Sequence, residues 1–208
     1  MEATEHEVTR MTEARSTKAG ADPEPAAEVE VLIVGAGPTG LTLAAQLQTF
    51  GTSFRIIDRL LDRGGESRAL AIQARSIEIF QSLGLGERMV AAGRTSTRLV
   101  LHFGDRLAEA GLTSFRAPDT RFPFILFLSQ AETERILNEH LTAQGVQVER
   151  GIELVRFSAS EHAVDCTLRD RDGREQQVRA RYLVGCDGAH STVRRGADIP
   201  FEGGPYLQ

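Results

Sequence analysis

The chain has 208 residues, of which 41% are hydrophobic and 25% are charged, and its formal net charge is −5. A chain of this size can bury a core without disulfides or a structural metal, and it contains no apolar run near the ~20 residues that a membrane-spanning helix needs. These values exclude a membrane-spanning protein, a collagen, a small disulfide scaffold and a wholly disordered chain.

Residues 1–28 form an acidic leader that we expect to be disordered, because large apolar side chains are almost absent from it. Residues 1–30 hold eight acidic and three basic side chains, which account for the whole net charge. The neutral remainder offers no field that would attract nucleic acid or an anionic membrane. Cys166 and Cys186 are far apart in sequence, so we expect reduced thiols and a cytoplasmic location.

A strand, a helix and a second strand follow the leader within about thirty residues. The run V-E-V-L-I-V at 29–34 predicts a buried parallel strand, residues 38–50 a helix, and residues 53–58 a second strand. Gly51 is placed to cap the helix. This order is typical of a βαβ unit, whose crossover is right-handed.

The remainder of the chain mixes short helices with β-structure. On the helix expected at 131–144, Ile136, Leu137 and Leu141 share the inward face. The expected helices are 73–83, 87–91, 131–144 and one from about 192; the expected strands are 98–103 with a turn at 104–105, one near 124, several within 146–180 with a hairpin turn at 172–173, and a buried strand at 182–186.

A glycine-rich turn, Gly35-Ala36-Gly37-Pro38-Thr39-Gly40, lies between the first strand and the first helix. In such a G-x-G-x-x-G motif the first glycine permits the tight turn, the second lets a pyrophosphate approach the backbone, and the third lets helix and strand pack closely. Pro38 suits the first helical position, and the free N–H groups that follow, including that of Thr39, face an anion. The motif predicts a phosphate cradle.

Asp58 stands at the end of the second strand, eighteen residues beyond Gly40. An acid there is placed to accept hydrogen bonds from a ribose diol, and its charge would repel a 2′-phosphate. We therefore expect a dinucleotide such as FAD or NAD, against the alternative of a purely structural turn. Arg59 either contacts the adenosine ribose or is solvated.

A second motif, C-D-G-A-H-S-T-V-R-R at 186–195, follows the strand expected at 182–186. Together with the glycine motif and the order of elements, it resembles the class A flavoprotein monooxygenases, the aromatic-hydroxylase family. In that family a D-G motif lies near the flavin pyrophosphate and the path of the nicotinamide coenzyme. By this resemblance, Asp187 contacts the cofactor, and Asp187 and Arg194 influence the approach of the coenzyme.

Two further stretches are similar to the same family. Ser67-Arg68-Ala69, with the helix that follows, matches the turn that runs under FAD, which makes Arg68 the cofactor-facing arginine. The stretch S-Q-A-E-T-E-R-I-L at 129–137 matches a glutamine-led helix, in which Gln130 contacts FAD. The resemblance covers residues 29–205.

The resemblance implies an α/β, Rossmann-like FAD-binding domain over residues 29–208, with a β-rich excursion around 95–125 that belongs to the substrate domain. The implied activity is FAD-dependent monooxygenation of a small aromatic or polyketide-type substrate, with NADH or NADPH as electron donor and O₂ as oxygen source. No catalytic residue is assigned.

Two alternatives stay open. A later G-D motif of the family is absent from the 208 residues, so the chain is alternatively a truncated or split FAD-binding fragment that needs a second polypeptide to complete the fold. An NAD-dependent dehydrogenase is the other alternative; the D-G motif and the lack of a Tyr-x-x-x-Lys pair argue against it.

Other residues invite less specific hypotheses. Ser191 is expected to cap a helix and not to act as a nucleophile, because no G-x-S-x-G surrounds it. The Phe-rich segment 115–127 either lines a substrate pocket or packs in the core. Cys186 is expected to be a small buried side chain. The five histidines form no H-x-x-x-H or Cys/His cluster, so we expect no metal.

Overall fold

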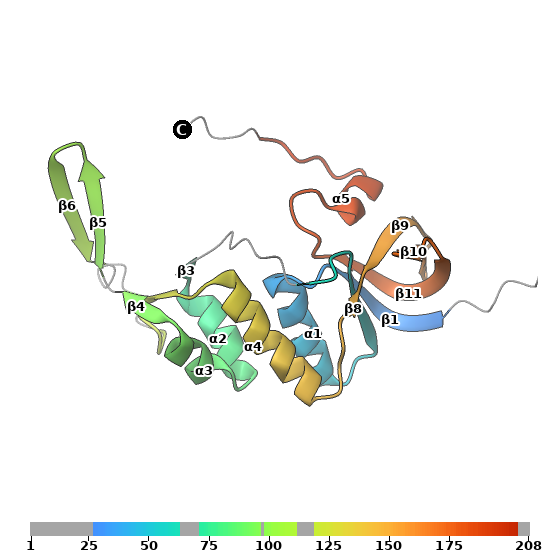
Figure 1. The fold of residues 1–208 in the computed structure, drawn as a ribbon, viewed down its shortest axis with the longest axis horizontal. Helices are drawn as coiled ribbons and strands as arrows, with labels where there is room; N and C mark the ends of the chain where they lie inside the picture. The colour runs from blue at the N-terminus through green and yellow to red at the C-terminus, as the bar shows by residue number, and fades with distance from the viewer. Residues whose placement is uncertain (1–26, 63–70, 97, 112–118, 204–208) are drawn as a thin grey trace, which may run out of the picture.

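The computed structural model describes residues 27–62, 71–96, 98–111 and 119–203, so nearly all of the acidic leader lies outside the described residues. The largest element is a six-stranded sheet in the order β8-β2-β1-β11-β10-β9 (Figure 1). Its strands are β1 (Ala27–Val34), β2 (Phe54–Asp58), β8 (Glu149–Arg150), β9 (Ile152–Ala159), β10 (Val164–Asp170) and β11 (Glu175–Gly185).

Strand β1 is central because it pairs in parallel with β2 on one side and with β11 on the other. Its side chains alternate between the two faces of the sheet, and both faces are covered: Ile33 belongs to one core cluster and Leu32 to the other. This explains the nearly continuous apolar run that predicted a buried parallel strand. The βαβ prediction is confirmed.

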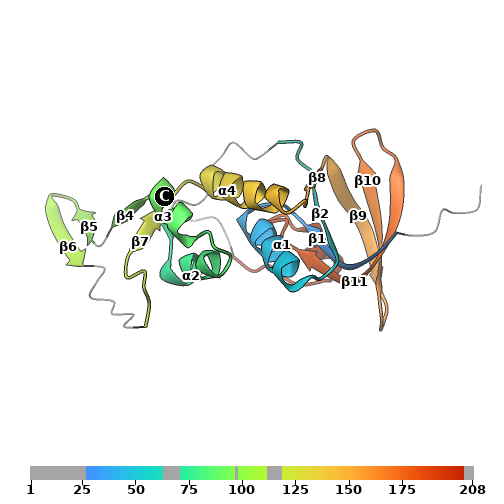
Figure 2. The same ribbon diagram turned by 90° about the horizontal axis from the view of Figure 1, so that it is seen from below.

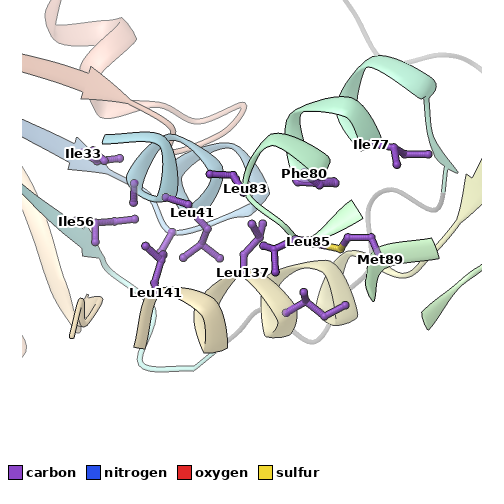
Figure 3. Close-up of a cluster of buried hydrophobic side chains, with 14 of the residues drawn as sticks. Ile33, Leu41, Ile56, Ile77, Phe80, Leu83, Leu85, Met89, Leu137 and Leu141 are labelled. Atoms are coloured by element: carbon purple, nitrogen blue, oxygen red, sulfur yellow. The ribbon is translucent and has the colours of Figure 1, made fainter. Parts of the chain in front are cut away.

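The first face of the sheet is covered by helices α1 (Pro38–Phe50) and α4 (Gln130–Ala143), as Figures 1 and 2 show. Ile136, Leu137 and Leu141 of α4 are buried there, as the helical periodicity predicted. Helices α2 (Ala74–Ser82) and α3 (Gly86–Ala92) extend the same cluster. Figure 3 shows Leu41 of α1 between the sheet and Leu137 of α4.

The second face is covered by the antiparallel part of the sheet itself. Leu154 of β9 and Cys166 and Leu168 of β10 pack in one cluster with Leu32 of β1 and Ile57 of β2. The predicted hairpin turn at 172–173 is confirmed between β10 and β11, with Gly173 at a φ of 81°.

The separate buried strand predicted at 182–186 is wrong. Residues 182–185 continue β11, which is a single strand of 11 residues. Its first half pairs with β10, and β1 pairs with it from Val178 to Gly185, so one strand serves two neighbours without a break. Tyr182 is 56% exposed, which also contradicts full burial.

A β-rich excursion lies beyond the helices. It consists of a three-stranded sheet, β3 (Ala71–Ile72), β7 (Ile125–Phe127) and β4 (Arg94–Ser96), and of the hairpin β5 (Arg98–Phe103) with β6 (Arg106–Gly111), which projects from the body in Figure 1. The predicted turn at 104–105 is confirmed, with Gly104 at a φ of 60°.

Two phenylalanines of the segment 115–127 pack in the core. Phe122 and Phe124 contact each other edge to face, with ring centroids 6.1 Å apart, and pack against the first core cluster. These two rings therefore serve the core, while Phe115 lies outside the described residues. Among the helices described, none is long and apolar enough to cross a membrane.

Replacing Leu137 by alanine should lower the free energy of unfolding by about 2–5 kcal/mol, because the side chain is fully buried between α1 and α4. Urea denaturation followed by circular dichroism measures this change. The same substitution at Leu107, which is 67% exposed on β6, is the matched control and should change the value by less than about 0.5 kcal/mol. Equal losses at the two positions would contradict the assigned core.

Candidate functional site

A cavity of about 530 Å³ opens at the carboxyl ends of β1, β2 and β11. This edge is where open α/β sheets bind ligands. The start of α4 and the β8–β9 corner complete its wall. Eight of the eleven residues predicted for the site line it: Gly35, Gly37, Pro38, Thr39, Asp58, Arg59, Gln130 and Asp187.

Gly35 is the point at which the three strand ends meet. Its N–H donates to the Ile57 carbonyl over 2.8 Å, and the Cys186 N–H donates to the Val34 carbonyl over 2.7 Å. The φ of Gly35 is +103°, and a Cβ at this position would lie 2.4 Å from the Cys186 carbonyl oxygen. Only glycine satisfies both the backbone conformation and the packing.

Gly40 does not line the cavity; it serves the close contact between α1 and the turn. A Cβ at Gly40 would lie 2.0 Å from the Gly35 carbonyl oxygen, so helix α1 approaches β1 at this point more closely than any side chain allows. This agrees with the role expected for the third glycine of the motif.

Gly37 differs from the other two glycines, because nothing in the described structure requires a glycine there. Its φ of −74° is open to any residue, and a Cβ would meet only the Glu134 Oε1 atom, at 4.0 Å. Gly37 and Glu134 both line the cavity. A ligand that approaches the backbone at Gly37 explains this glycine, and the protein's own packing does not.

The N-terminus of α1 faces the same space. Gly37 is the N-cap, Pro38 follows, no side chain caps the helix and no acid lies in its first turn. The unpaired N–H groups and the positive end of the helix dipole therefore favour an anion, such as a pyrophosphate.

Asp58 holds the glycine-rich turn. Its Oδ2 accepts the Ala36 N–H over 2.7 Å and its Oδ1 accepts the Leu60 N–H over 2.8 Å. Each carboxylate oxygen has two lone pairs, so both oxygens can accept a further hydrogen bond from a ribose hydroxyl. The structure adds a positioning role to the ribose contact predicted from the sequence.

Asp187 ties the segment after β11 to the short helix α5 (Thr192–Gly196). Its Oδ2 accepts the N–H of Thr192 over 2.6 Å and that of Val193 over 3.5 Å, while its Oδ1 is buried without a hydrogen-bond partner in the described structure. Ser191 Oγ accepts the Arg194 N–H over 2.9 Å, which confirms the predicted cap.

Arg194, one of the predicted arginines, is not among the described residues that line the cavity. Arg194 stacks on the Phe201 ring at 4.7 Å and donates to the Ala189 and Ile199 carbonyls over 3.4 and 3.5 Å, so it braces the segment that carries Asp187. Arg68 lies outside the described residues.

The sequence analysis missed several lining residues, among them Glu134, Arg150 and Glu153. Arg150 and Glu153 come from the corner between β8 and β9, and their position depends on strand pairing that no local motif specifies. Glu134 carried a signal: it stands three residues before Leu137, on the inward face of α4, where a charge is unusual.

Neither cysteine has the character of a reactive thiolate. Burial, helped by the negative charge of Asp187, raises the pKa of Cys186 above its ordinary value. Burial raises the pKa of Cys166 to about 11. Both thiols therefore stay protonated at neutral pH, as expected of small packing side chains.

A family model described as "FAD binding domain" matches residues 28–206. The chain belongs to this FAD-binding domain family. The comparisons give no support to the dehydrogenase alternative. The open space at Gly37, the uncapped start of α1 and the unpartnered Asp187 oxygen fit the polar parts of FAD.

Among curated relatives, this FAD-binding domain is 41% identical over 174 residues to 6-methylpretetramide 4-monooxygenase of Streptomyces rimosus, covering 84% of this chain and 31% of that protein. It is 37% identical over 185 residues to pentachlorophenol 4-monooxygenase of Sphingobium chlorophenolicum, with 88% and 34% covered. The chain thus spans about a third of the length of the curated relatives it matches.

Solved structures give the same answer. The flavin-dependent monooxygenase PieE, in complex with FAD and substrate, matches with a TM-score of 0.75 and 30% identity over 88% of this chain and 34% of PieE. The anhydrotetracycline hydroxylase OxyS of Streptomyces rimosus matches with a TM-score of 0.72 and 33% identity, over 86% of this chain and 35% of OxyS. The predicted α/β, Rossmann-like FAD-binding fold is confirmed.

Gly40→Ala should lower the free energy of unfolding by about 2–3 kcal/mol, because the new Cβ meets backbone that cannot move aside. Gly37→Ala should change it by less than about 1 kcal/mol, because its Cβ enters open space. Urea titration of the two variants measures the difference. A Gly37 variant as unstable as the Gly40 variant would show that the fold itself requires a glycine at 37.

Proposed function

We propose that the cavity holds the FAD of this domain by its ADP half. In this arrangement the pyrophosphate lies against Gly37 and the first N–H groups of α1, and the adenosine ribose lies on Asp58 with Arg59 beside it. Gln130, Asp187 and Arg68 make further contacts with the cofactor. The observation that carries the proposal is the open space beside Gly37, at the uncapped start of a helix.

We further propose that this chain serves a monooxygenase that hydroxylates a small aromatic or polyketide-type substrate, with NADH or NADPH as electron donor. The names of the relatives support this, since they include a pretetramide and a chlorophenol monooxygenase. When bound, FAD supplies the redox chemistry that joins NAD(P)H oxidation to O₂ use. The free thiols of Cys166 and Cys186 support a reducing, cytoplasmic location.

The chain's own contribution is to bind and orient the cofactor. Asp58 and Asp187 anchor the loops on either side of β1 through backbone N–H groups, which fixes the shape of the cradle before the cofactor arrives. Arg194 braces the loop of Asp187 through the Ala189 carbonyl, and through this loop we propose that it influences the approach of the coenzyme. The excursion around 95–125 is proposed as part of the substrate domain.

A second candidate function is FAD binding without independent hydroxylation, with a second polypeptide completing the enzyme. The observation that favours it is that the chain spans only 31% and 34% of the two relatives named above. Both candidate functions use the same cofactor site; they differ in whether this chain alone hydroxylates a substrate.

Gly37→Ala should weaken FAD binding at least tenfold, because the new methyl group occupies the space proposed for the pyrophosphate. Quenching of flavin fluorescence on titration of the full chain measures the dissociation constant. Gly104→Ala, at the tip of the β5–β6 hairpin, is the control and should leave it unchanged. A wild-type chain that takes up no FAD would overturn the cofactor assignment.

Oxidation of NADH and NADPH by the FAD-loaded chain separates the two candidates. Absorbance at the reduced-nicotinamide band is followed with and without added phenols, and products are identified by mass spectrometry. The first candidate expects consumption that rises with a phenol and yields a hydroxylated product. The second expects bound FAD and no hydroxylated product under any of these conditions.

A further inference from the structure

Glu134 is a buried acid beside the proposed cofactor. Only 4% of its surface is exposed, and it lies on the same face of α4 as Leu137 and Leu141. Burial of a charged group is costly unless other groups compensate it. A position of this kind is normally apolar, so the carboxylate needs an explanation beyond packing.

The carboxylate contacts a residue that is itself part of the cofactor cavity. Gln130 Nε2 donates to Glu134 Oε1 over 2.8 Å, one turn apart on α4. The same Oε1 atom lies 4.0 Å from the Cβ position of Gly37, the residue at the phosphate cradle. Both Gln130 and Glu134 line the cavity.

This hydrogen bond fixes which end of the Gln130 amide meets Glu134. A carboxylate only accepts hydrogen bonds, whereas a glutamine amide has a donating NH₂ group at one end and an accepting carbonyl oxygen at the other. The NH₂ group must therefore face Glu134, and the carbonyl oxygen is directed away from it. Without an acceptor at position 134, nothing at that position selects which end of the amide faces it.

The orientation decides what kind of ligand group Gln130 can meet. Phosphate oxygens are acceptors and would need the NH₂ end, whereas a hydroxyl group can donate to the carbonyl end. FAD carries both kinds of group, because its sugar and ribityl parts bear hydroxyls on either side of the pyrophosphate.

We propose that Glu134 is a positioning residue that holds the Gln130 carbonyl as an acceptor for a hydroxyl group of the cofactor and keeps the amide from turning toward the phosphates. The inference rests on the proposed FAD site. It assigns to Glu134 an effect on affinity that passes through Gln130 and not through direct contact with the cofactor.

A double-mutant cycle tests this route. FAD affinity is measured by fluorescence quenching for the full chain, for Glu134→Leu, which removes the acceptor, for Gln130→Leu and for the double variant. Loss of the Glu134 charge changes attraction for the pyrophosphate in both backgrounds alike, whereas its effect through Gln130 exists only when Gln130 is present. We expect Glu134→Leu to be about tenfold more damaging when Gln130 is present than when position 130 is leucine.

Equal effects in the two backgrounds would overturn the proposal, since Glu134 would then act on charge or folding alone. Glu139→Leu is the control on the same helix: Glu139 is exposed, pairs with Arg88 and Arg135, and should show no coupling to Gln130. Failure of the wild-type chain to bind FAD would count against the proposed function and is visible in the same titration before any variant is compared.

A second readout needs no cofactor. In ¹⁵N-labelled apo protein the side-chain NH₂ signals of Gln130, assigned by their loss in Gln130→Leu, should be slowed in hydrogen exchange by the bond to Glu134. Glu134→Leu, which offers no acceptor, should change their shifts and speed their exchange, while Glu139→Leu should leave them in place. Unchanged Gln130 signals in Glu134→Leu would show that the carboxylate does not orient the amide.

Discussion

The close backbone approach at Gly35 is the constraint on which the rest of the site depends. The Gly35 N–H reaches the end of β2, and a Cβ at Gly35 would lie 2.4 Å from the carbonyl of Cys186 after β11. This contact brings three strand ends together at one edge of the sheet. Helix α1 starts three residues after Gly35, so the same turn also places the start of this helix at the cavity.

The acids around the cavity are arranged to stabilise loops before they meet a ligand. Asp58 accepts two backbone N–H groups on the β2 side, and Asp187 accepts two on the β11 side. Glu134 accepts the amide of Gln130 from the α4 side. The anion would be bound by backbone N–H groups at the start of α1. No side chain caps this helix and no acid lies in its first turn. In the proposed site the pyrophosphate meets backbone N–H groups and the positive end of the helix dipole, so a chain with a formal net charge of −5 can still bind it.

Local sequence patterns correctly predicted strand β1 and helix α4, because in each of them burial alone produced the pattern. The apolar run of β1 and the inward face of α4 were recognisable because burial on both faces of a strand, or on one face of a helix, leaves a periodic sequence. The prediction of a separate strand at 182–186 was wrong because an apolar pattern does not reveal how many neighbours a strand has. Strand β11 pairs with β10 and with β1 over overlapping stretches, so it continues without a break to Gly185.

The sequence by itself determined the cradle, since Gly35, Gly37, Pro38 and Gly40 act within one strand–turn–helix unit whose geometry is local, and the resemblance carried Gln130 and Asp187 to the same site. Only the tertiary structure decided which distant groups complete the wall. The packing of α4 on α1 places Glu134 at the cavity, and the pairing of β8 with β2 places Arg150 there. Arg194 does not line the cavity and instead braces the loop that carries Asp187. These placements depend on contacts between elements far apart in the chain, which no local motif encodes.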